Sequence, residues 1–194
     1  ETLKVITMVY AGYINKNLVA KLQSLGCNAI GLCGADANII KAHKRIHPTI
    51  DYGYVGDIDH VDTGFFKILF NNNVTPVFAP VTHDENGLLN TNADSIAKEI
   101  ASAMSQLYHV HLVYCFEKSG VLMEPENDNS TIAQMNEATY LELKNKKIIS
   151  SGMIPKLDNS FDALKSGVQK VLIGNADKLH DLLTYHSGTA IVHE

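Results

Sequence analysis

The chain has 194 residues, of which 45% are hydrophobic and 19% are charged, a balance typical of one globular domain or two small ones. Its formal net charge of −5 and the lack of a long basic run argue against a nucleic-acid-binding protein. No apolar run is long enough to span a membrane, and the N-terminal residues lack the pattern of a signal peptide, so we expect a cytoplasmic protein.

Cysteine and histidine spacing predicts neither disulfides nor a metal site. Cys27, Cys33 and Cys115 form no CxxC pair and lie in or beside apolar runs, which is typical of buried thiols in a reducing compartment. The nine histidines show no HExxH or Cys/His ligand spacing. We therefore expect no metal site made by the protein alone.

The first half of the chain alternates between helical and extended patterns. In order, the patterns predict a helix over residues 2–25, a buried strand over 28–32, an edge hairpin over 39–55, a helix over 61–73 and a buried strand over 74–80. Gly12 interrupts the first helix and Gly26 ends it. A polar loop, THDENG, follows the last of these strands. The first helix is apolar on more than one side, so it suits either a subunit contact in a homo-oligomer or a buried core helix.

The second half continues the alternation. In order, it predicts a helix over 93–107, a strand over 110–116, a helix over 136–144, a helix carrying Leu157, Phe161, Leu164 and Val168, a strand over 168–173, a helix over 177–185 and a strand over 190–193. The segment MEPENDNS is the most polar and predicts an exposed loop. The whole pattern predicts an α/β fold with an open, mostly parallel sheet and helices on both faces. Ligands of such sheets bind in the loops beyond the carboxyl ends of the strands.

The stretch GLLNTNAD, residues 87–94, is the first candidate site. If residues 88–92 are extended, Asn90, Asn92 and Asp94 project to the same side, and Asp94 lies near the N-terminus of the following helix. The alternative is that the asparagines fill a turn and Asp94 caps the helix.

The stretch GMIPK, residues 152–156, is the second candidate site. A lysine at a helix N-terminus opposes the helix dipole by about 0.3 to 1 kcal/mol, whereas a bound phosphate there is favoured by both the dipole and the lysine. Gly152 would let backbone amides approach such an anion, and Pro155 suits the first helical turn. The alternative is an exposed Lys156 whose ammonium group lies in water.

Together the two stretches suit phosphoryl transfer, because Lys156 supplies positive charge and Asp94 a carboxylate that holds lysines in place. A nucleotide-binding module without catalysis fits the pattern equally well. Neither GxxxxGK[ST] nor GxGxxG occurs, so a different kinase architecture is required.

Over nearly its whole length the chain resembles the N-acetylglutamate kinases of the amino acid kinase superfamily. The resemblance is carried, in the family's order and spacing, by ITMVYAGYINKNLVAKL, NAIGLCGAD, YGYVGDI, VTPVFAPVTHD, GLLNTNAD, GMIPKLDNSFDAL and GTAIV. It implies transfer of the γ-phosphoryl group of ATP, with Mg2+, to the side-chain carboxylate of an N-acylated glutamate in arginine biosynthesis. It also implies a homo-oligomer whose subunits have two lobes, with residues 1–92 for the acylglutamate and 93–194 for ATP.

The resemblance assigns roles to particular residues. It implies that Asn90 holds the α-carboxylate end of the amino acid, that Asn92 lines the same pocket and that Asp94 orients the catalytic lysines. Lys156 matches the lysine that stabilises charge on the transferring phosphoryl group, and the hairpin over 39–55 is expected to be part of a lid. The nucleotide pocket is expected to include Glu117, Lys118, Gly120, Val121, Ile148, Ile149, Ser150 and Gly152.

Two departures from the family pattern bear on these expectations. The family has Ser or Thr, Asp, then Val after the first strand of the ATP lobe, where this chain has Tyr114, Cys115, Phe116, Glu117 and Lys118 and a longer loop. The family's first strand with its lysine and glycines, its second glycine-rich loop and an arginine for the α-carboxylate all belong upstream of Glu1. We therefore expect the native protein to be longer and the chain as given to have little activity. N-succinylglutamate as acceptor, another superfamily member such as carbamate kinase or aspartokinase, and a noncatalytic sensor on the same fold remain alternatives.

Overall fold

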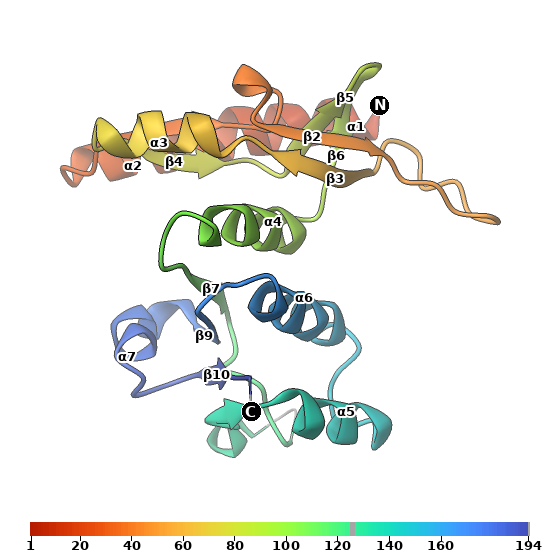
Figure 1. The fold of residues 1–194 in the computed structure, drawn as a ribbon, viewed down its shortest axis with the longest axis vertical. Helices are drawn as coiled ribbons and strands as arrows, with labels where there is room; N and C mark the ends of the chain where they lie inside the picture. Colours follow the sequence, from red (N-terminus) through yellow and green to blue (C-terminus); the bar gives the residue numbers. More distant parts are fainter. Residues whose placement is uncertain (125–126, 194) are drawn as a thin grey trace. The chain divides into compact units, whose positions relative to one another are not determined.

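The structure is a computed structural model, and it describes residues 1–124 and 127–193. It divides the chain into two units, Glu1–Ile96 and Ala97–Glu194, and the boundary falls inside helix α4 (Ala93–Ser105) (Figure 1). Which ligand each unit binds stays a prediction. Among the described residues no helix combines the length and the apolar character needed to span a membrane.

The first unit begins with a continuous helical segment. It consists of α1 (Thr2–Ile6), a π-helical stretch η1 (Thr7–Ile14) and α2 (Asn15–Ser24). The predicted interruption at Gly12 was wrong, because the backbone widens into a π-helix there and the segment continues. The predicted end at Gly26 is confirmed: this glycine has a φ of 79°, and the N–H groups of Gly26 and Cys27 donate to the carbonyls of Gln23 and Leu22.

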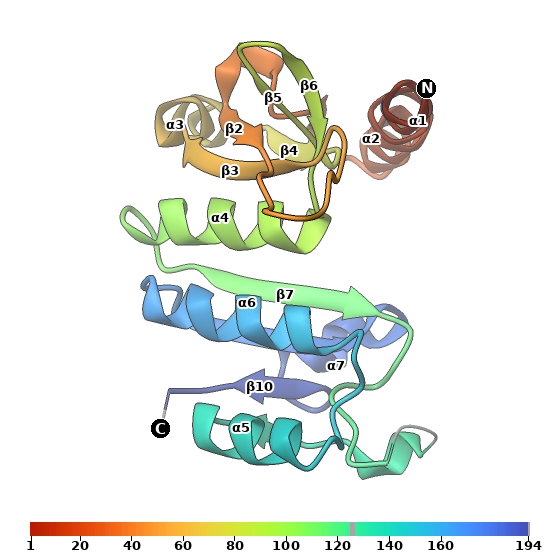
Figure 2. The same cartoon turned by 90° about the vertical axis from the view of Figure 1, so that its right-hand side faces the viewer.

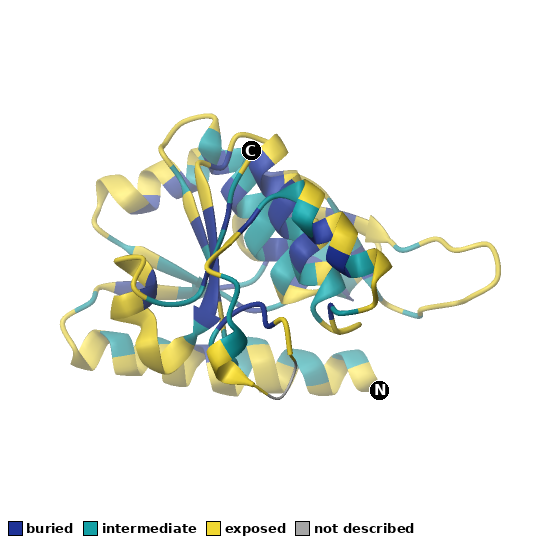
Figure 3. Ribbon diagram, turned by 90° about the horizontal axis from the view of Figure 1, so that it is seen from below, coloured by how far each residue is buried: buried dark blue, intermediate teal, exposed yellow. Residues whose placement is uncertain are grey.

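Most large apolar side chains of this helical segment are exposed (Figure 3), including Met8 at 64% and Tyr13 at 74%. Its one buried residue is the polar Asn15, whose Nδ2 group donates to the carbonyl of Val77 at 2.8 Å. This bond is one of several side-chain hydrogen bonds that join the segment to the neighbouring strands.

Two parallel strands, β1 (Ala29–Leu32) and β4 (Thr75–Phe78), follow the helical segment in this unit. Helices α2 and α3 (Thr63–Asn71) lie on opposite sides of them (Figure 2). Asp62 caps α3 by accepting a hydrogen bond from the Gly64 N–H group. The ring of Phe66 stacks on that of Phe78 with their centroids 5.5 Å apart, which closes the helix onto the strand.

A separate four-stranded sheet has the order β3-β2-β5-β6. Its strands are β2 (Ile40–Lys44), β3 (Gly56–Val61), β5 (Val81–Asp84) and β6 (Gly87–Asn90), and a short turn of 3-10 helix η2 (Asp36–Asn38) precedes β2. The edge hairpin is present outside the β1–β4 sheet, as predicted, but its return strand is β3 and residues 45–55 form a long connection. The predicted loop THDENG was wrong, because its first residues belong to β5 and only a tight turn separates β5 from β6.

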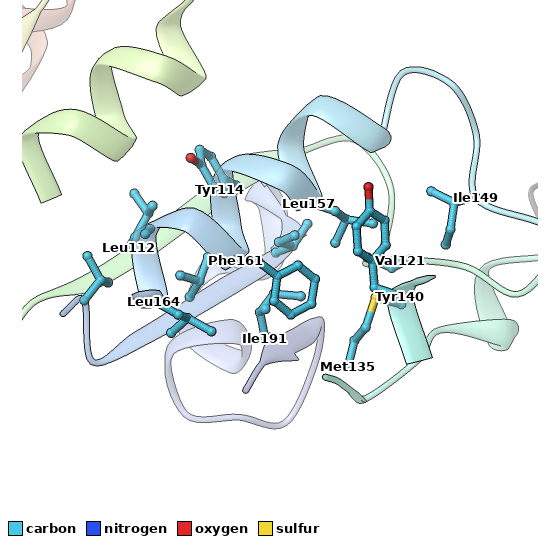
Figure 4. Packing of buried hydrophobic residues seen from close by; sticks show 14 of the residues in the cluster. Leu112, Tyr114, Val121, Met135, Tyr140, Ile149, Leu157, Phe161, Leu164 and Ile191 are labelled. Atoms are coloured by element: carbon cyan, nitrogen blue, oxygen red, sulfur yellow. The ribbon is translucent and has the colours of Figure 1, made fainter. Parts of the chain in front are cut away.

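The second unit holds a four-stranded sheet of order β7-β9-β10-β8. Its strands are β7 (His111–Phe116), β8 (Gln134–Met135), β9 (Lys170–Asn175) and β10 (Thr189–Ile191). Helices α5 (Glu137–Asn145) and α6 (Ile154–Lys165) cover one face, and α7 (Leu179–Leu183) covers the other (Figures 1 and 2). Strand β8 was not predicted, and Gly167 follows the end of α6 with a φ of 101°. The α6 face and the sheet share an apolar cluster that includes Leu112, Leu157 and Phe161 (Figure 4).

The predicted α/β class is confirmed, with helices on both faces of sheets that contain the parallel pairs β1–β4, β2–β5, β7–β9 and β8–β10. The strands are divided among three sheets rather than collected in one. The predicted exposed loop MEPENDNS contains a turn of 3-10 helix, η3 (Asp128–Ser130), and Pro125 and Glu126 lie outside the described residues. A second such turn, η4 (Ala176–Lys178), precedes α7.

Candidate active site

In the first unit, the segment from Asn90 to Asp94 is anchored by the buried Thr91, which is 2% exposed. The Thr91 hydroxyl donates to the carbonyl of Gly56 at 3.2 Å, so the 2.7 Å contact with Thr82 is one in which Thr82 donates. A Cβ atom on Gly56 would lie 2.8 Å from both hydroxyl oxygens, so the site requires glycine. The Asn90 N–H group donates to the carbonyl of Tyr54 at 2.8 Å, which ties the segment to the hairpin connection.

Asn92 is the residue that caps α4. Its Oδ1 atom accepts hydrogen bonds from the backbone N–H groups of Asp94 at 2.8 Å and Ser95 at 3.3 Å. Strand β6 ends at Asn90, so residues 88–90 of the predicted extended stretch lie in a strand and residues 91–92 follow it. Asp94 lies in the first turn of α4, where the helix dipole favours a carboxylate. The alternative that Asp94 itself is the cap was also wrong.

The second unit brings its predicted residues together around one cavity of about 320 Å3. Phe116, Leu122 and Met153 line the cavity as well and were not predicted. The predicted residues that line it are Glu117, Lys118, Gly120, Val121, Ile148, Ile149, Ser150, Gly152 and Lys156. Their proximity is a structural fact, and their individual roles stay predictions.

The loop that follows β7 is held by contacts from distant parts of the chain. The Val121 N–H group donates to the hydroxyl of the fully buried Thr189 at 2.8 Å, and the Asn175 side chain donates to the carbonyl of Glu117 at 2.8 Å. A Cβ atom on Gly120 would lie 2.7 Å from that Thr189 hydroxyl, so this position requires glycine. The loop is therefore held by residues of β9 and β10, a relation that no local pattern could have predicted.

The N-terminus of α6 borders the cavity and has no side-chain cap. Met153 occupies the cap position and supplies no side-chain hydrogen bond, and the first turn contains no acidic residue. A Cβ atom on Gly152 would meet nothing within 4 Å, so this backbone faces open space. Backbone donors, a positive dipole end and Lys156 thus border one cavity, which is the arrangement expected of an anion site.

Helix α6 is joined to α5 by a polar contact close to Lys156. The Tyr140 hydroxyl donates to Asp158 Oδ1 at 2.6 Å, and Lys144 Nζ lies 3.0 Å from the same oxygen. Burial raises the pKa of Tyr140, and the hydrogen bond to Asp158 raises it further. The tyrosine is therefore a neutral donor at physiological pH, and it fixes the first turns of α6 to α5.

The predicted lid hairpin contains an ion pair between its strand β3 and the start of its connection. Arg45 donates to Asp57 through Nε at 3.0 Å and through Nη2 at 2.6 Å. These hydrogen bonds lower the pKa of Asp57 and raise that of Arg45. The pair joins the two ends of the long connection, residues 45–55, and so limits its movement.

Two further observations concern alternative sites. Among residues 1–124 and 127–193 no group of three or more His, Cys, Asp or Glu side chains is placed to hold a metal ion. A larger cavity of about 630 Å3 lies in the second unit, lined by residues that include Lys170, Tyr185 and His186. None of the predicted site residues lines it, so cavity size alone does not locate the predicted site.

Sequence and structure comparisons relate this chain to known proteins. Residues 1–175 match the amino acid kinase family. The chain is 53% identical to the acetylglutamate kinase of Cytophaga hutchinsonii, an alignment that covers 99% of the chain and 74% of that protein. It is 51% identical to the acetylglutamate kinase of Bacteroides fragilis, with 93% and 69% covered. The solved structure of smu.665 from Streptococcus mutans UA159 superposes with a TM-score of 0.82 at 26% identity, covering 99% of this chain and 72% of that one.

Proposed function

The chain belongs to the amino acid kinase family, and on that basis we propose that it uses ATP to phosphorylate the side-chain carboxylate of N-acetylglutamate in arginine biosynthesis. The observation that carries the proposal is the cavity of the second unit, because it gathers the nine residues that the resemblance assigns to nucleotide binding and phosphoryl transfer. The 53% identity to an acetylglutamate kinase supports the choice of acceptor.

The proposed reaction is an in-line displacement at phosphorus. A carboxylate oxygen of the acceptor forms a bond to the γ-phosphorus of ATP, and the bond from that phosphorus to the β–γ bridging oxygen breaks. The electron pair of the broken bond leaves with ADP, so the products are an acyl phosphate and ADP. Negative charge spreads over the transferring group and the leaving oxygen, and cations held in position lower the barrier by stabilising that charge.

Lys156 is the cation that we propose for this task in the second unit. It lies in the first turn of α6, where the dipole and the backbone donors also favour a phosphate. Lys118 lines the same cavity and adds a second positive charge, and among the lining residues that the structure describes Glu117 is the one carboxylate. The apolar side chains of Ile148 and Val121 suit the base of the nucleotide.

Mg2+ is proposed to bind together with the nucleotide. The ion is usually held by substrate phosphates, waters and one or two carboxylates rather than by a dedicated protein cage. Lys118, Lys156, the α6 N-terminus without a side-chain cap and the Glu117 carboxylate fit a phosphate chain that carries its own cation. When bound, Mg2+ would neutralise charge on the β- and γ-phosphate oxygens.

The first unit is proposed to bind the acylglutamate. Asn90 would hold the α-carboxylate end, Asn92 would line the same pocket and Asp94 would orient catalytic lysines, roles that rest on the resemblance. The anchoring of this segment by Thr91 supports the proposal, because a binding group must be held rigidly to select its ligand. A cytoplasmic location and assembly into a homo-oligomer are further parts of the proposal.

The proposed function is tested by measuring ADP formation by the full-length protein with MgATP and a panel of acceptors. N-acetylglutamate should be turned over, while aspartate and carbamate should not. N-succinylglutamate in the same panel decides whether the acyl group matters. Turnover of aspartate or carbamate instead would assign another activity of the family, and ATP binding without turnover of any acceptor would favour a noncatalytic sensor.

A further inference from the structure

Two residues outside the cavity of about 320 Å3 hold the loop that forms part of its wall. Among the described residues, neither Thr189 nor Asn175 lines that cavity. The Thr189 hydroxyl accepts a hydrogen bond from the Val121 N–H group at 2.8 Å. The Asn175 side chain donates to the carbonyl of Glu117, also at 2.8 Å. Because Glu117 and Val121 both line the cavity, strands β9 and β10 hold the two ends of one wall segment.

The hydrogen bond to Thr189 lies inside the protein. Thr189 is 0% exposed and Val121 is 2% exposed, so bulk water does not reach the bond. The Val121 side chain belongs to the apolar cluster (Figure 4), and its carbonyl accepts a hydrogen bond from the Ile132 N–H group at 2.8 Å. If the hydroxyl were lost, the Val121 N–H group would therefore stay unpaired or the loop would have to move.

We propose that Thr189 and Asn175 are positioning residues that set the affinity for the nucleotide by fixing residues 117–121. This inference rests on the proposed function. Each residue acts through a backbone group of the loop rather than by touching the ligand. A wall that is fixed before the nucleotide arrives loses less conformational entropy on binding, so the complex is tighter.

The loop needs such restraint because it contains Gly120. Glycine has more backbone freedom than any other residue, so ordering it costs the most entropy. A Cβ atom at this position would lie 2.7 Å from the Thr189 hydroxyl oxygen and 3.2 Å from the Gly188 carbonyl carbon, so the loop crosses directly over the start of β10. The same close approach that requires glycine thus brings the loop within reach of the hydroxyl.

Calorimetric titration of the full-length protein with MgADP tests the role of Thr189. Thr189→Val should raise the Kd by roughly 5- to 100-fold, the effect of leaving one buried N–H group without its acceptor. Thr189→Ser keeps the hydroxyl, so its Kd should stay within about threefold of the wild-type value. Thr82→Val removes a fully buried hydroxyl from the first unit and should leave the Kd unchanged.

Asn175 makes two hydrogen bonds that substitution separates. Its Oδ1 atom accepts from the Asp177 N–H group at 2.7 Å and caps η4, while its Nδ2 group holds the Glu117 carbonyl. Asn175→Asp keeps the cap and places a carboxylate oxygen where the donor was. The Kd for MgADP should then rise by roughly 3- to 10-fold, less than in Thr189→Val because Asn175 is only partly buried.

Kinetics and hydrogen exchange separate positioning from a general loss of structure. In Thr189→Val the KM for ATP should rise with the Kd, while kcat at saturating ATP should stay within about threefold, because the proposed cation Lys156 is carried by α6. Amide exchange of residues 117–122 should be faster in Thr189→Val and Asn175→Asp than in the wild type. Thr189→Ser should exchange as the wild type does.

Three results would overturn the inference: an unchanged Kd in Thr189→Val, an equal rise in Thr189→Ser or Thr82→Val, and unchanged exchange of residues 117–122. If Thr189→Val did not fold, an unchanged Kd in Asn175→Asp would overturn it. A wild-type protein that bound no MgADP would contradict the proposed function and the inference together. With a wild type that binds MgADP, the failures above would count against the inference alone.

Discussion

At the scale of single residues, Lys156 supplies the charge on which the proposed chemistry depends. Lys156→Met should lower kcat by roughly 100- to 1000-fold, the usual effect of losing one preorganised group that stabilises transition-state charge. The dissociation constant of ATP should change far less, because the remaining cavity residues still bind the nucleotide. Both values can be measured by stopped-flow or steady-state kinetics combined with calorimetric titration.

Lys165→Met is the matched control for that variant. Lys165 lies at the other end of α6 and pairs with Glu137 at 2.6 Å, so its loss removes a lysine from the same helix without touching the cavity. Its kcat should equal that of the wild type. Equal losses in the two variants would mean that Lys156 acts through the stability of α6 and not through its charge.

Asn92 combines two roles that substitution can separate. Asn92→Ala should lower the free energy of unfolding by about 1 kcal/mol, because the cap of α4 is lost. Asn92→Asp keeps the cap and places a negative charge beside the proposed pocket for an anionic acceptor. Repulsion should then raise the KM for N-acetylglutamate by about tenfold, with little change in stability. An unchanged KM in Asn92→Asp would show that Asn92 is a helix cap alone.

At the scale of elements, the β2–β3 hairpin should lose stability in acid because of Asp57. Hydrogen bonds from Arg45 depress the folded-state pKa of this carboxyl, so its contribution is present above the unfolded pKa of about 3.9 and is lost as the pH falls through the lower folded value. Both side chains are more than a third exposed, so we expect a contribution below about 1 kcal/mol that added salt reduces further.

Urea unfolding of the wild type and of Asp57→Asn measures this contribution. The difference in unfolding free energy between them should be present near pH 6 and should shrink as the pH falls from the unfolded pKa of about 3.9 through the lower folded value. The double variant with Arg45→Leu should be no less stable than Asp57→Asn alone. A difference that stayed the same at every pH down to acid unfolding would contradict the assignment to this ion pair.

The contact between α2 and β1 depends on a glycine. A Cβ atom on Gly31 would lie 1.9 Å from Asn15 Oδ1, and Asn15 is held in place by its buried hydrogen bond to Val77. Gly31→Ala should therefore lower the free energy of unfolding by about 2 kcal/mol, through a displaced helix or a broken hydrogen bond.

Gly12→Ala provides the comparison, because the nearest atom to its added Cβ, the Thr7 carbonyl oxygen, would be 3.9 Å away. This variant should be as stable as the wild type or gain up to about 1 kcal/mol, since alanine favours helix. Thermal melting of the two variants checks both values. Equal stability in Gly31→Ala and the wild type would show that α2 is not held against β1 by Asn15.

Periodicity predicted the elements that bury one apolar face and missed those defined by partners far away in the chain. Helices α3, α4 and α6 and strands β1, β4, β7 and β9 appear close to their predicted positions. Strand β5 was missed because Thr82, His83 and Asp84 look like a polar loop until β2 and β6 pair with them. Strand β8 has two residues and is defined by its pairing with β10, more than 50 residues later.

The candidate site shows the same limit. The nine residues of the cavity were predicted from the resemblance, and the GMIPK stretch had marked Gly152 and Lys156 independently. Thr189 was not, because it lies in another element and holds the loop only through the Val121 N–H group.

At the scale of the whole molecule, the two units carry different parts of the proposed reaction. The second unit gathers two lysines and an open helix N-terminus in one cavity, and the first holds two asparagines and an aspartate on an anchored backbone. The proposal that residues 1–92 bind the acylglutamate and residues 93–194 bind ATP follows from this difference and from the resemblance.

The most direct test of that proposal is the product. The full-length protein is incubated with MgATP, N-acetylglutamate and hydroxylamine, which converts an acyl phosphate into a hydroxamate that can be quantified. We expect one hydroxamate for each ADP released, formation only when both substrates are present, and a loss of roughly 100-fold or more in Lys156→Met. ADP release without hydroxamate, or no product from either N-acetylglutamate or N-succinylglutamate, would contradict the assignment of an acylglutamate kinase.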